Sequence, residues 1–258
     1  MKYKPEIIHV AGVKNFRGLG GIKVGGRHFK YGLAFRSGSL HKIRPNGEIT
    51  LQKLGIQVDI DLRTESERIQ KPDPEIGGMD YLGYDLLHRP GTGISREKRM
   101  EDKKSYIKWL KSCKKMEDLY VHILSSCLPT LKQMFGECVS CLLENKPFLF
   151  HCSAGKDRTG LTAFLILGIL GAEKKEIVDD YLLTRRYEDK KEKWRARLVK
   201  FQDYRAGKIA ISMVTAKRSY IEAAFSYIEK EGGFHRYATE KLGLGEATIE
   251  ALKENCLE

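Results

Sequence analysis

The spacing of apolar side chains predicts strands in the first part of the chain. Residues 56–62 alternate apolar and polar side chains with period two, which is typical of a strand with one buried face. Residues 79–84 form a second candidate strand, and the short apolar run 147–150 forms a third. The first 40 residues are rich in glycine and contain short apolar pieces such as 32–35, which indicates turns and edge strands.

The rest of the pattern is mainly helical. Leu51 and Leu54 lie on a short helix that ends at Gly55, and the almost wholly apolar stretch 161–170 predicts a helix inside the core. Further helices are expected at 96–145, where the first is strongly basic, at 173–185, 188–203 and 213–230, and as two short ones after Gly233. Strands alternating with helices early, then helices alone, predict an α/β fold with a central mostly parallel sheet and a helical C-terminal layer.

The composition is that of a globular protein. Of 258 residues, 41% are hydrophobic and 31% are charged, which excludes the disordered and fibrous classes. The longest uncharged apolar stretch, residues 161–172, is shorter than the roughly 20 residues that a membrane-spanning helix needs. No repeat or linker divides the chain, so we expect a single domain over residues 1–258. The first residues lack the apolar segment of a secretory signal, so we expect a cytoplasmic protein, or a secreted one whose signal has been removed.

The cysteines predict free thiols. The six positions 113, 127, 138, 141, 152 and 256 follow no framework spacing, and a chain of this length does not need disulfides. Cys138-x-x-Cys141 resembles half of a zinc or redox site, but without a second pair a helical pair packed in the core is the better interpretation. We expect no metal and no cofactor.

One segment concentrates the chemistry. Between the strand at 147–150 and the apolar helix lies the sequence His151-Cys152-Ser153-Ala154-Gly155-Lys156-Asp157-Arg158-Thr159-Gly160. The amino end of a helix presents unpaired amides and a positive dipole, and small residues at 153–155 let the backbone wrap around an anion. The same field stabilises a thiolate at Cys152, and Arg158 can donate a planar fork to two phosphoryl oxygens.

This loop, read as H-C-x-x-G-x-x-R-[ST]-G, resembles the active-site loop of the cysteine-dependent protein tyrosine and dual-specificity phosphatases. With its Lys156-Asp157 pair it is similar to the bacterial tyrosine phosphatases that act on phosphotyrosine and also on phosphoinositides. The resemblance spans nearly the whole chain, through residues 15–17, 19–21, 35–38, 54–56, 61–63, 179–182 and Gly232-Gly233 before a terminal helix. It implies the three-layer tyrosine phosphatase fold and a phosphocysteine intermediate.

The leaving oxygen needs a proton, which a carboxylic acid held over the loop supplies. In the resembling families this acid comes from a separate upstream loop, and the matching residue is Asp85, after the strand at 79–84. We assign Asp85 as the general acid, although the usual Trp-Pro-Asp sequence is absent and a capping role for Asp85 stays open. Asp157 is the rival acid; its expected role is to orient the loop by accepting backbone hydrogen bonds.

Other polar residues around the loop have two interpretations each. Lys156 is a second cation for a multiply charged head group, or a solvent-facing lysine. Thr159 hydrogen-bonds the nucleophilic sulfur, or caps the helix. His151 is expected to brace the loop through backbone bonds rather than to act as a base. Arg36 and Arg63 are expected to be structural partners of buried carboxylates or carbonyls.

The net charge of +12 lies mostly outside this loop. Residues 96–115 carry a net charge of +6 and residues 185–200 a net charge of +5, and each stretch contains one of the two tryptophans. Basic helices with aromatic residues can lie on an anionic membrane surface or cover an active site, and they can also be ordinary solvated faces. Because residues 96–145 follow the Asp85 loop, this helical insertion is a possible lid.

Together these features predict a phosphatase for phosphorylated proteins, phosphoinositides or both. Its catalytic residues would be Cys152, Arg158 and Asp85, and its substrate-binding residues would be Ser153, Ala154, Gly155, Lys156, Asp157 and Thr159. A catalytically silent phosphate-binding module fits less well, because nucleophile, cation and acid are all present. A nucleic-acid-binding protein has no recognised motif here, so no nucleic-acid partner is expected. The sequence predicts neither the preferred substrate nor the oligomeric state.

Overall fold

The computed structural model describes residues 6–87, 107–108, 111 and 115–258. Its main sheet has the strand order β1-β4-β7-β5-β6. The strand β1 runs antiparallel to β4, and the other neighbours are parallel. The strands are β1 (Arg17–Gly18), β4 (Ala34–Gly38), β5 (Val58–Asp61), β6 (Asp80–Gly83) and β7 (Phe148–Cys152), with a separate hairpin of β2 (Lys23–Val24) and β3 (Arg27–His28).

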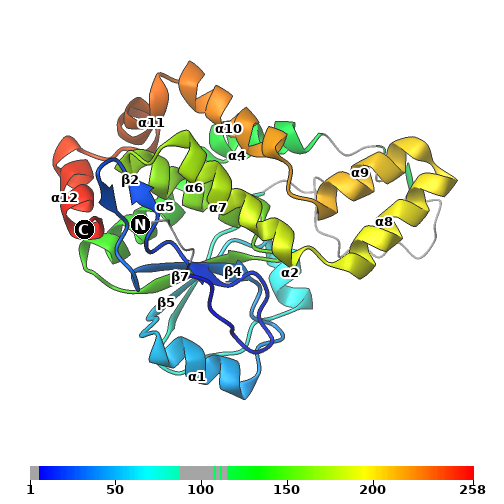
Figure 1. The fold of residues 1–258 in the computed structure, drawn as a ribbon, viewed down its shortest axis with the longest axis horizontal. Coiled ribbons are helices and arrows are strands. Elements are labelled where there is room, and N and C mark those ends of the chain that lie inside the picture. Colours follow the sequence, from blue (N-terminus) through cyan, green and yellow to red (C-terminus); the bar gives the residue numbers. More distant parts are fainter. Residues whose placement is uncertain (1–5, 88–106, 109–110, 112–114) are drawn as a thin grey trace.

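The central strand β7 contributes side chains to both faces of the sheet. Phe148 and Phe150 pack on one face, and Leu149 packs on the other face with Phe35 of β4. Because helices cover both sides of the sheet, a central strand has apolar side chains on both faces, and its sequence is a continuous apolar run. The result is a three-layer α/β arrangement, with α1 (Pro45–Lys53) on one side of the sheet and α6 (Asp157–Leu170) among the helices on the other (Figure 1).

Helices form most of the second half of the chain. Beside α2 (Glu65–Gln70) near the sheet, they are α4 (Met116–Ser126), α5 (Leu128–Leu143), α7 (Lys174–Leu183), α8 (Lys190–Gln202), α9 (Tyr204–Val214), α10 (Arg218–Lys230), α11 (Gly233–Arg236) and α12 (Glu246–Cys256), with a 3₁₀ turn η1 (Thr184–Tyr187) and a π turn η2 (Tyr237–Leu242). This arrangement confirms the predicted α/β class with a helical C-terminal layer. No helix in the described part of the chain is long and apolar enough to cross a membrane.

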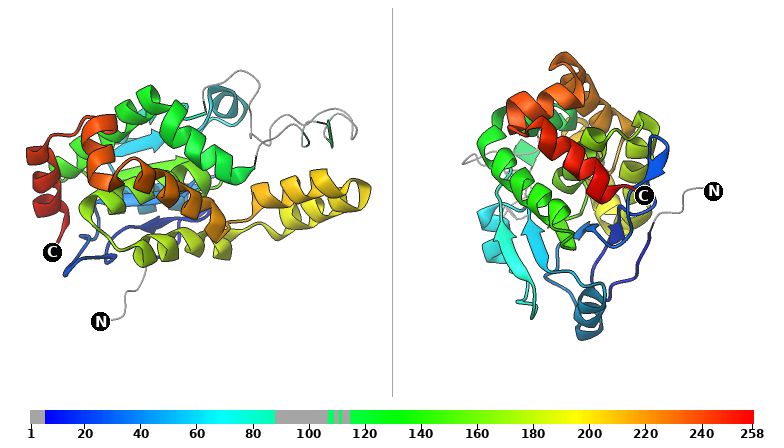
Figure 2. Two further views of the ribbon diagram at one scale, coloured as in Figure 1. Left: turned by 90° about the horizontal axis from the view of Figure 1, so that it is seen from above. Right: turned by 90° about the vertical axis from the view of Figure 1, so that its left-hand side faces the viewer.

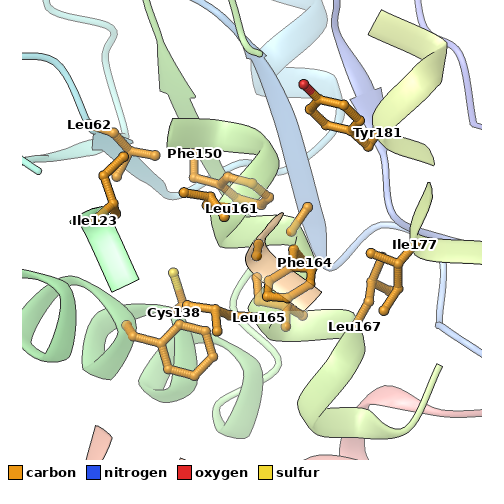
Figure 3. Close-up of a cluster of buried hydrophobic side chains, with 14 of the residues drawn as sticks. Leu62, Ile123, Cys138, Phe150, Leu161, Phe164, Leu165, Leu167, Ile177 and Tyr181 are labelled. Carbon is orange, nitrogen blue, oxygen red and sulfur yellow. The ribbon is translucent and has the colours of Figure 1, made fainter. Parts of the chain in front are cut away.

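The apolar helix α6 lies in the middle of the larger core. Every residue from Arg158 to Leu170 is buried, and Phe164 and Leu165 lie among side chains from α4, α5 and α7 (Figure 3). A Cβ on Gly168 would lie 2.1 Å from the Phe234 ring, so this position needs glycine for close packing. Because α6 directly follows β7, the loop between them is held at both ends by the core.

Several details differ from the sequence prediction, among them α2, for which no helix was predicted. The strand β4 was expected at an edge, but it lies inside the sheet, since β1 covers its outer side. The helix α9 was not predicted: residues 204–212 were placed outside the helices at 188–203 and 213–230. Its start is signalled by Asp203, whose carboxylate accepts a hydrogen bond from the Ala206 amide, as at a typical N-cap.

The helices α8 and α9 form a hairpin that projects from the rest of the molecule (Figures 1 and 2). The predicted helices at 116–145 correspond to α4 and α5. Most of the basic stretch 96–115, including its tryptophan, lies outside the described residues, so the possible lid within 96–145 stays a prediction.

Candidate active site

The loop between β7 and α6 is held from behind by residues from the amino-terminal part of the chain. The Gly155 carbonyl accepts hydrogen bonds from Asn15 Nδ2 (2.7 Å) and Arg36 Nη2 (3.1 Å). In a trans peptide the next N–H points the opposite way, so the Lys156 amide is turned away from these donors. Gly155 has a φ of +64°, and a Cβ there would lie 2.4 Å from the Ser37 carbonyl oxygen. Only glycine fits this position.

A buried ion network fixes Arg36 in turn. Arg36 Nη1 contacts one carboxylate oxygen of Asp180, and Arg17 Nε donates to the other at 2.8 Å. Burial and the neighbouring Arg17 lower the pKa of Arg36 to about 10. Burial alone would raise the pKa of Asp180, but the two arginines bring it below its ordinary value. The structural role predicted for Arg36 is confirmed.

The thiol of Cys152 is buried at the end of β7. Burial acts to raise the pKa of the thiol, but the Arg158 charge and hydrogen bonds from Thr159 and from the Ala154 amide bring it below the ordinary value. The buried Thr159 hydroxyl has no hydrogen-bond partner of good geometry among the described residues, so it is free to turn toward the Cys152 sulfur. The loop therefore favours a thiolate, the nucleophilic form of cysteine.

Arg158 is held by a carboxylate that the sequence analysis did not identify. Its two Nη atoms donate to Glu67 at 2.5 and 2.9 Å, and Nη1 also donates to the Leu62 carbonyl at 3.1 Å. Ser153 Oγ donates to the same carboxylate at 2.5 Å. Despite burial, which acts in the opposite direction, Arg158 lowers the pKa of Glu67 to about 2. Glu67 thus fixes the orientation of the guanidinium.

The position of Glu67 follows from a capping box at the start of α2. The Thr64 side chain accepts from the Glu67 amide, and the Glu67 carboxylate accepts from the Thr64 amide at 2.8 Å. The sequence Thr64-x-x-Glu67 is the usual signature of this motif. The motif can be recognised in the sequence, but it predicts only the start of a helix and not the contact between Glu67 and Arg158.

His151 lies between three aspartates below the loop. Its Nε2 is 3.1 Å from Asp59 Oδ1 and 3.2 Å from Asp73 Oδ2, and its Nδ1 is 3.8 Å from Asp61 Oδ1. Burial acts to lower the pKa of His151, but the aspartates raise it to about 10. The imidazolium braces the strand through carboxylates, whereas the sequence predicted backbone bonds.

The same group is where a metal ion would be sought. Asp59, Asp73 and His151 have ligand atoms within 4.8 Å of one another, the only such group found among the described residues. However, Arg63 Nη2 already donates to Asp73 Oδ2 at 2.7 Å, and Arg63 also binds Asp61. Since Arg63 and the imidazolium of His151 already neutralise the carboxylates, these contacts fit an ion network better than a metal site. The structural role expected for Arg63 is confirmed.

Lys156 and Asp157 begin α6 and contact each other. Lys156 Nζ is 3.1 Å from Asp157 Oδ1 and donates to the Thr215 carbonyl at 3.0 Å. The Lys156 side chain is buried, so it is not the solvent-facing lysine that the sequence left open. Asp157 accepts from the Tyr120 hydroxyl at 2.8 Å, where backbone donors were expected.

A cavity of about 430 Å³ opens above the loop. Its wall includes Cys152, Ser153, Ala154, Lys156, Asp157 and Arg158, and it carries six lysines and arginines against four acidic residues. Leu87 is on this wall, but Asp85 is not among the described residues that form it. Asp85 Oδ1 accepts from the Leu87 amide at 2.9 Å, which is a local turn contact. The structure brings every predicted site residue except Asp85 to the loop.

A buried cysteine, an arginine held by a carboxylate and the amino end of a helix converge on one basic cavity. The model of the tyrosine phosphatase family matches residues 8–258. The chain belongs to this family. The resemblance seen in the sequence is therefore confirmed over almost the whole length.

The individual relatives share a third or less of their aligned residues with this chain. A tyrosine-protein phosphatase of Nostoc commune is 33% identical over 152 residues, which is 59% of this chain; the chain spans only 48% of the relative's length. The triple specificity protein phosphatase PtpB of Mycobacterium tuberculosis is 25% identical over 256 residues, covering 86% of this chain and 90% of PtpB. The crystal structure of TpbA from P. aeruginosa matches 77% of the chain and 90% of TpbA at 13% identity, with a TM-score of 0.33, too loose to bear on the fold.

Proposed function

We propose that this protein hydrolyses phosphate monoesters through a phosphocysteine intermediate. The observation that carries the proposal is the placement of the buried Cys152 thiol and Arg158 on the wall of one basic cavity, where the guanidinium acts to lower the pKa of the thiol. The loop amides and the guanidinium are suited to bind a phosphoryl group. A thiolate at Cys152 would face the phosphorus of that group. Membership of the tyrosine phosphatase family supports the same reaction.

The reaction has two balanced steps. The Cys152 sulfur attacks phosphorus, the bond from phosphorus to the ester oxygen breaks, and the leaving oxygen takes a proton from a carboxylic acid. A water oxygen then attacks phosphorus, the carboxylate takes up the water proton, and the bond from phosphorus to sulfur breaks. Arg158 and the amides of residues 153–158 stabilise the charge on the three equatorial oxygens in both steps.

We propose Asp85 as the general acid, with Asp157 as the alternative. Asp157 lines the cavity, but its carboxylate already contacts Lys156 Nζ and accepts a hydrogen bond from the Tyr120 hydroxyl. The Asp85 turn leads to Leu87 on the cavity wall, so Asp85 lies two residues from that wall along the chain. Replacing the true acid by asparagine lowers kcat about 10²- to 10⁴-fold for a phenyl phosphate and far less for an ester with a good leaving group. Comparison of Asp85→Asn with Asp157→Asn on both esters assigns the role.

We propose phosphotyrosine proteins as substrates, with phosphoserine, phosphothreonine and phosphoinositides as further classes. The relative PtpB is named a triple specificity phosphatase. Lys14, Lys42 and Lys71 line the cavity in addition to the loop cations, which suits a ligand with more than one phosphate. Because phosphoinositides lie in membranes, an anionic membrane surface is part of the proposal. Phosphate release from a phosphotyrosine peptide, a phosphoserine peptide and short-chain phosphoinositides ranks the classes.

The proposal is tested with Cys152→Ser. This variant should lose turnover of p-nitrophenyl phosphate and retain binding of a phosphotyrosine peptide, because the cradle stays intact. Vanadate should inhibit the wild type competitively, and EDTA should have no effect. Turnover by Cys152→Ser at the wild-type rate would refute the scheme.

A further inference from the structure

The helix α8 has an apolar stripe that faces away from its hairpin partner. Trp194, Leu198 and Phe201 are separated by four and three residues, which places them on one face of the helix. Their exposed fractions are 59%, 38% and 89%. Ala196, on the opposite face, is buried, and a Cβ on Gly207 of α9 would lie 2.2 Å from Lys200 Cα. The inner face of α8 thus packs tightly on α9.

Cations flank this stripe. Lys190, Lys191 and Arg197 project from the same side of the helix by the same spacing rule, and all three are exposed. None of them forms an ion pair with another described residue. The single acidic residue of α8, Glu192, lies on the inner side and is 2.8 Å from Arg195. The outer face of α8 therefore combines aromatic and aliphatic groups with unneutralised positive charge.

We propose that this outer face of α8 binds an anionic lipid bilayer. A single exposed apolar side chain is ordinary, but three in register between lysines and arginines form the pattern of a helix lying in the membrane interface. The aromatic side chains would enter the boundary between headgroups and acyl chains, and the cations would contact lipid phosphates. A protein groove could accept the apolar stripe, but it would also need carboxylates opposite every flanking cation, whereas an anionic bilayer presents negative charge in all directions.

The hairpin also forms part of the active-site wall. Glu188 and Asp189 precede α8, Met213 and Val214 end α9, and all four line the cavity. The Thr215 carbonyl, directly after α9, accepts the hydrogen bond from Lys156. A membrane-bound α8 would hold the cavity beside the lipid surface, where the phosphoinositide class of the proposed function lies. The docking itself does not depend on that function.

The test is sedimentation of the full chain with vesicles of phosphatidylcholine alone or with one third phosphatidylglycerol. The wild type should sediment with the anionic vesicles only. Trp194→Ala/Phe201→Ala and Lys190→Glu/Arg197→Glu should each lower the partition coefficient by about tenfold or more. Matched controls are Ile49→Ala/Ile69→Ala, two exposed apolar side chains on α1 and α2, and Lys23→Glu/Lys53→Glu; both should bind as the wild type does.

Several results would overturn the docking proposal: no binding by the wild type, equal binding to neutral vesicles, or a hairpin variant that binds normally. Tighter binding to duplex DNA than to the vesicles, lost in Lys190→Glu/Arg197→Glu, would assign the face to nucleic acid instead. Turnover of soluble p-nitrophenyl phosphate separates the two proposals. Both hairpin variants should keep it, and Cys152→Ser should lose it while still binding vesicles.

Discussion

At the scale of single residues, the site depends on one nucleophile and on groups that hold its neighbours in place. Cys152 and Arg158 are identifiable from the sequence because a nucleophile and a fork donor at fixed spacing have few other uses. The role of Glu67 could not be identified from the sequence, because Glu67 lies 91 residues before Arg158 and only the folded chain brings the two side chains together. A single substitution can therefore test the role of each of these residues.

Glu67→Gln should lower kcat for p-nitrophenyl phosphate by about a hundredfold, because Arg158 loses the carboxylate that aims it. Inhibition by vanadate should weaken in parallel, which loss of the α2 cap alone would not cause. Glu65→Gln, an exposed change in the same helical turn, is the control and should leave both quantities unchanged. Unchanged vanadate inhibition in Glu67→Gln would mean that Glu67 does not position the guanidinium.

At the scale of elements, buried charge networks connect the amino-terminal strands to the loop. Arg17 of β1 and Arg36 of β4 meet Asp180 of α7, and Arg36 reaches the Gly155 carbonyl. The strands β5 and β7 and the apolar helix α6 could be predicted, β5 from its alternating side chains and β7 and α6 from their continuous apolar runs. The split between α8 and α9 was not predicted, because an aspartate inside a helical pattern does not by itself reveal a helix end, and the bond from the Ala206 amide to Asp203 is seen only in the structure.

Asp180→Asn should lower the free energy of unfolding by about 3–5 kcal/mol, because two buried arginines lose their shared carboxylate. The neighbouring Asp179→Asn is the matched control: its side chain is 47% exposed and its one partner among the described residues is an exposed lysine, so the change should be within about 0.5 kcal/mol. Urea denaturation measures both. Equal effects of the two substitutions would show that the network does not stabilise the fold.

The network around His151 should make stability fall at alkaline pH. Its pKa rises from about 6.5 in the unfolded chain to about 10 in the folded protein. The stabilisation is therefore complete below pH 6.5 and is lost as the pH rises toward 10. In a Cys152→Ser background, which removes the opposing effect of the thiol, the free energy of unfolding should fall between pH 7 and 9 by up to about 1.4 kcal/mol per pH unit. The same slope after His151→Asn would contradict this assignment.

At the scale of the whole molecule, we expect the net charge of +12 and the basic cavity to attract an anionic substrate before it binds. For an acidic phosphotyrosine peptide, kcat/KM should fall roughly tenfold between low salt and about 0.3 M NaCl, while kcat stays constant, because salt screens long-range attraction. A peptide with neutral flanking residues is the control and should show a smaller decrease. Equal salt dependence of the two peptides would show that the surface charge does not guide association.

The fold brings three distant parts of the chain to one loop: the amino-terminal strands, the α2 cap and the base of the α8–α9 hairpin. The family match covers residues 8–258, while the proposed nucleophilic chemistry centres on the Cys152 loop. The most direct test of that chemistry is rapid quenching of the wild type with ³²P-labelled phosphotyrosine peptide, followed by mapping of the label. The phosphoryl group should be found on Cys152 during turnover. Full turnover with no labelled cysteine, or label on another residue, would contradict the phosphocysteine mechanism.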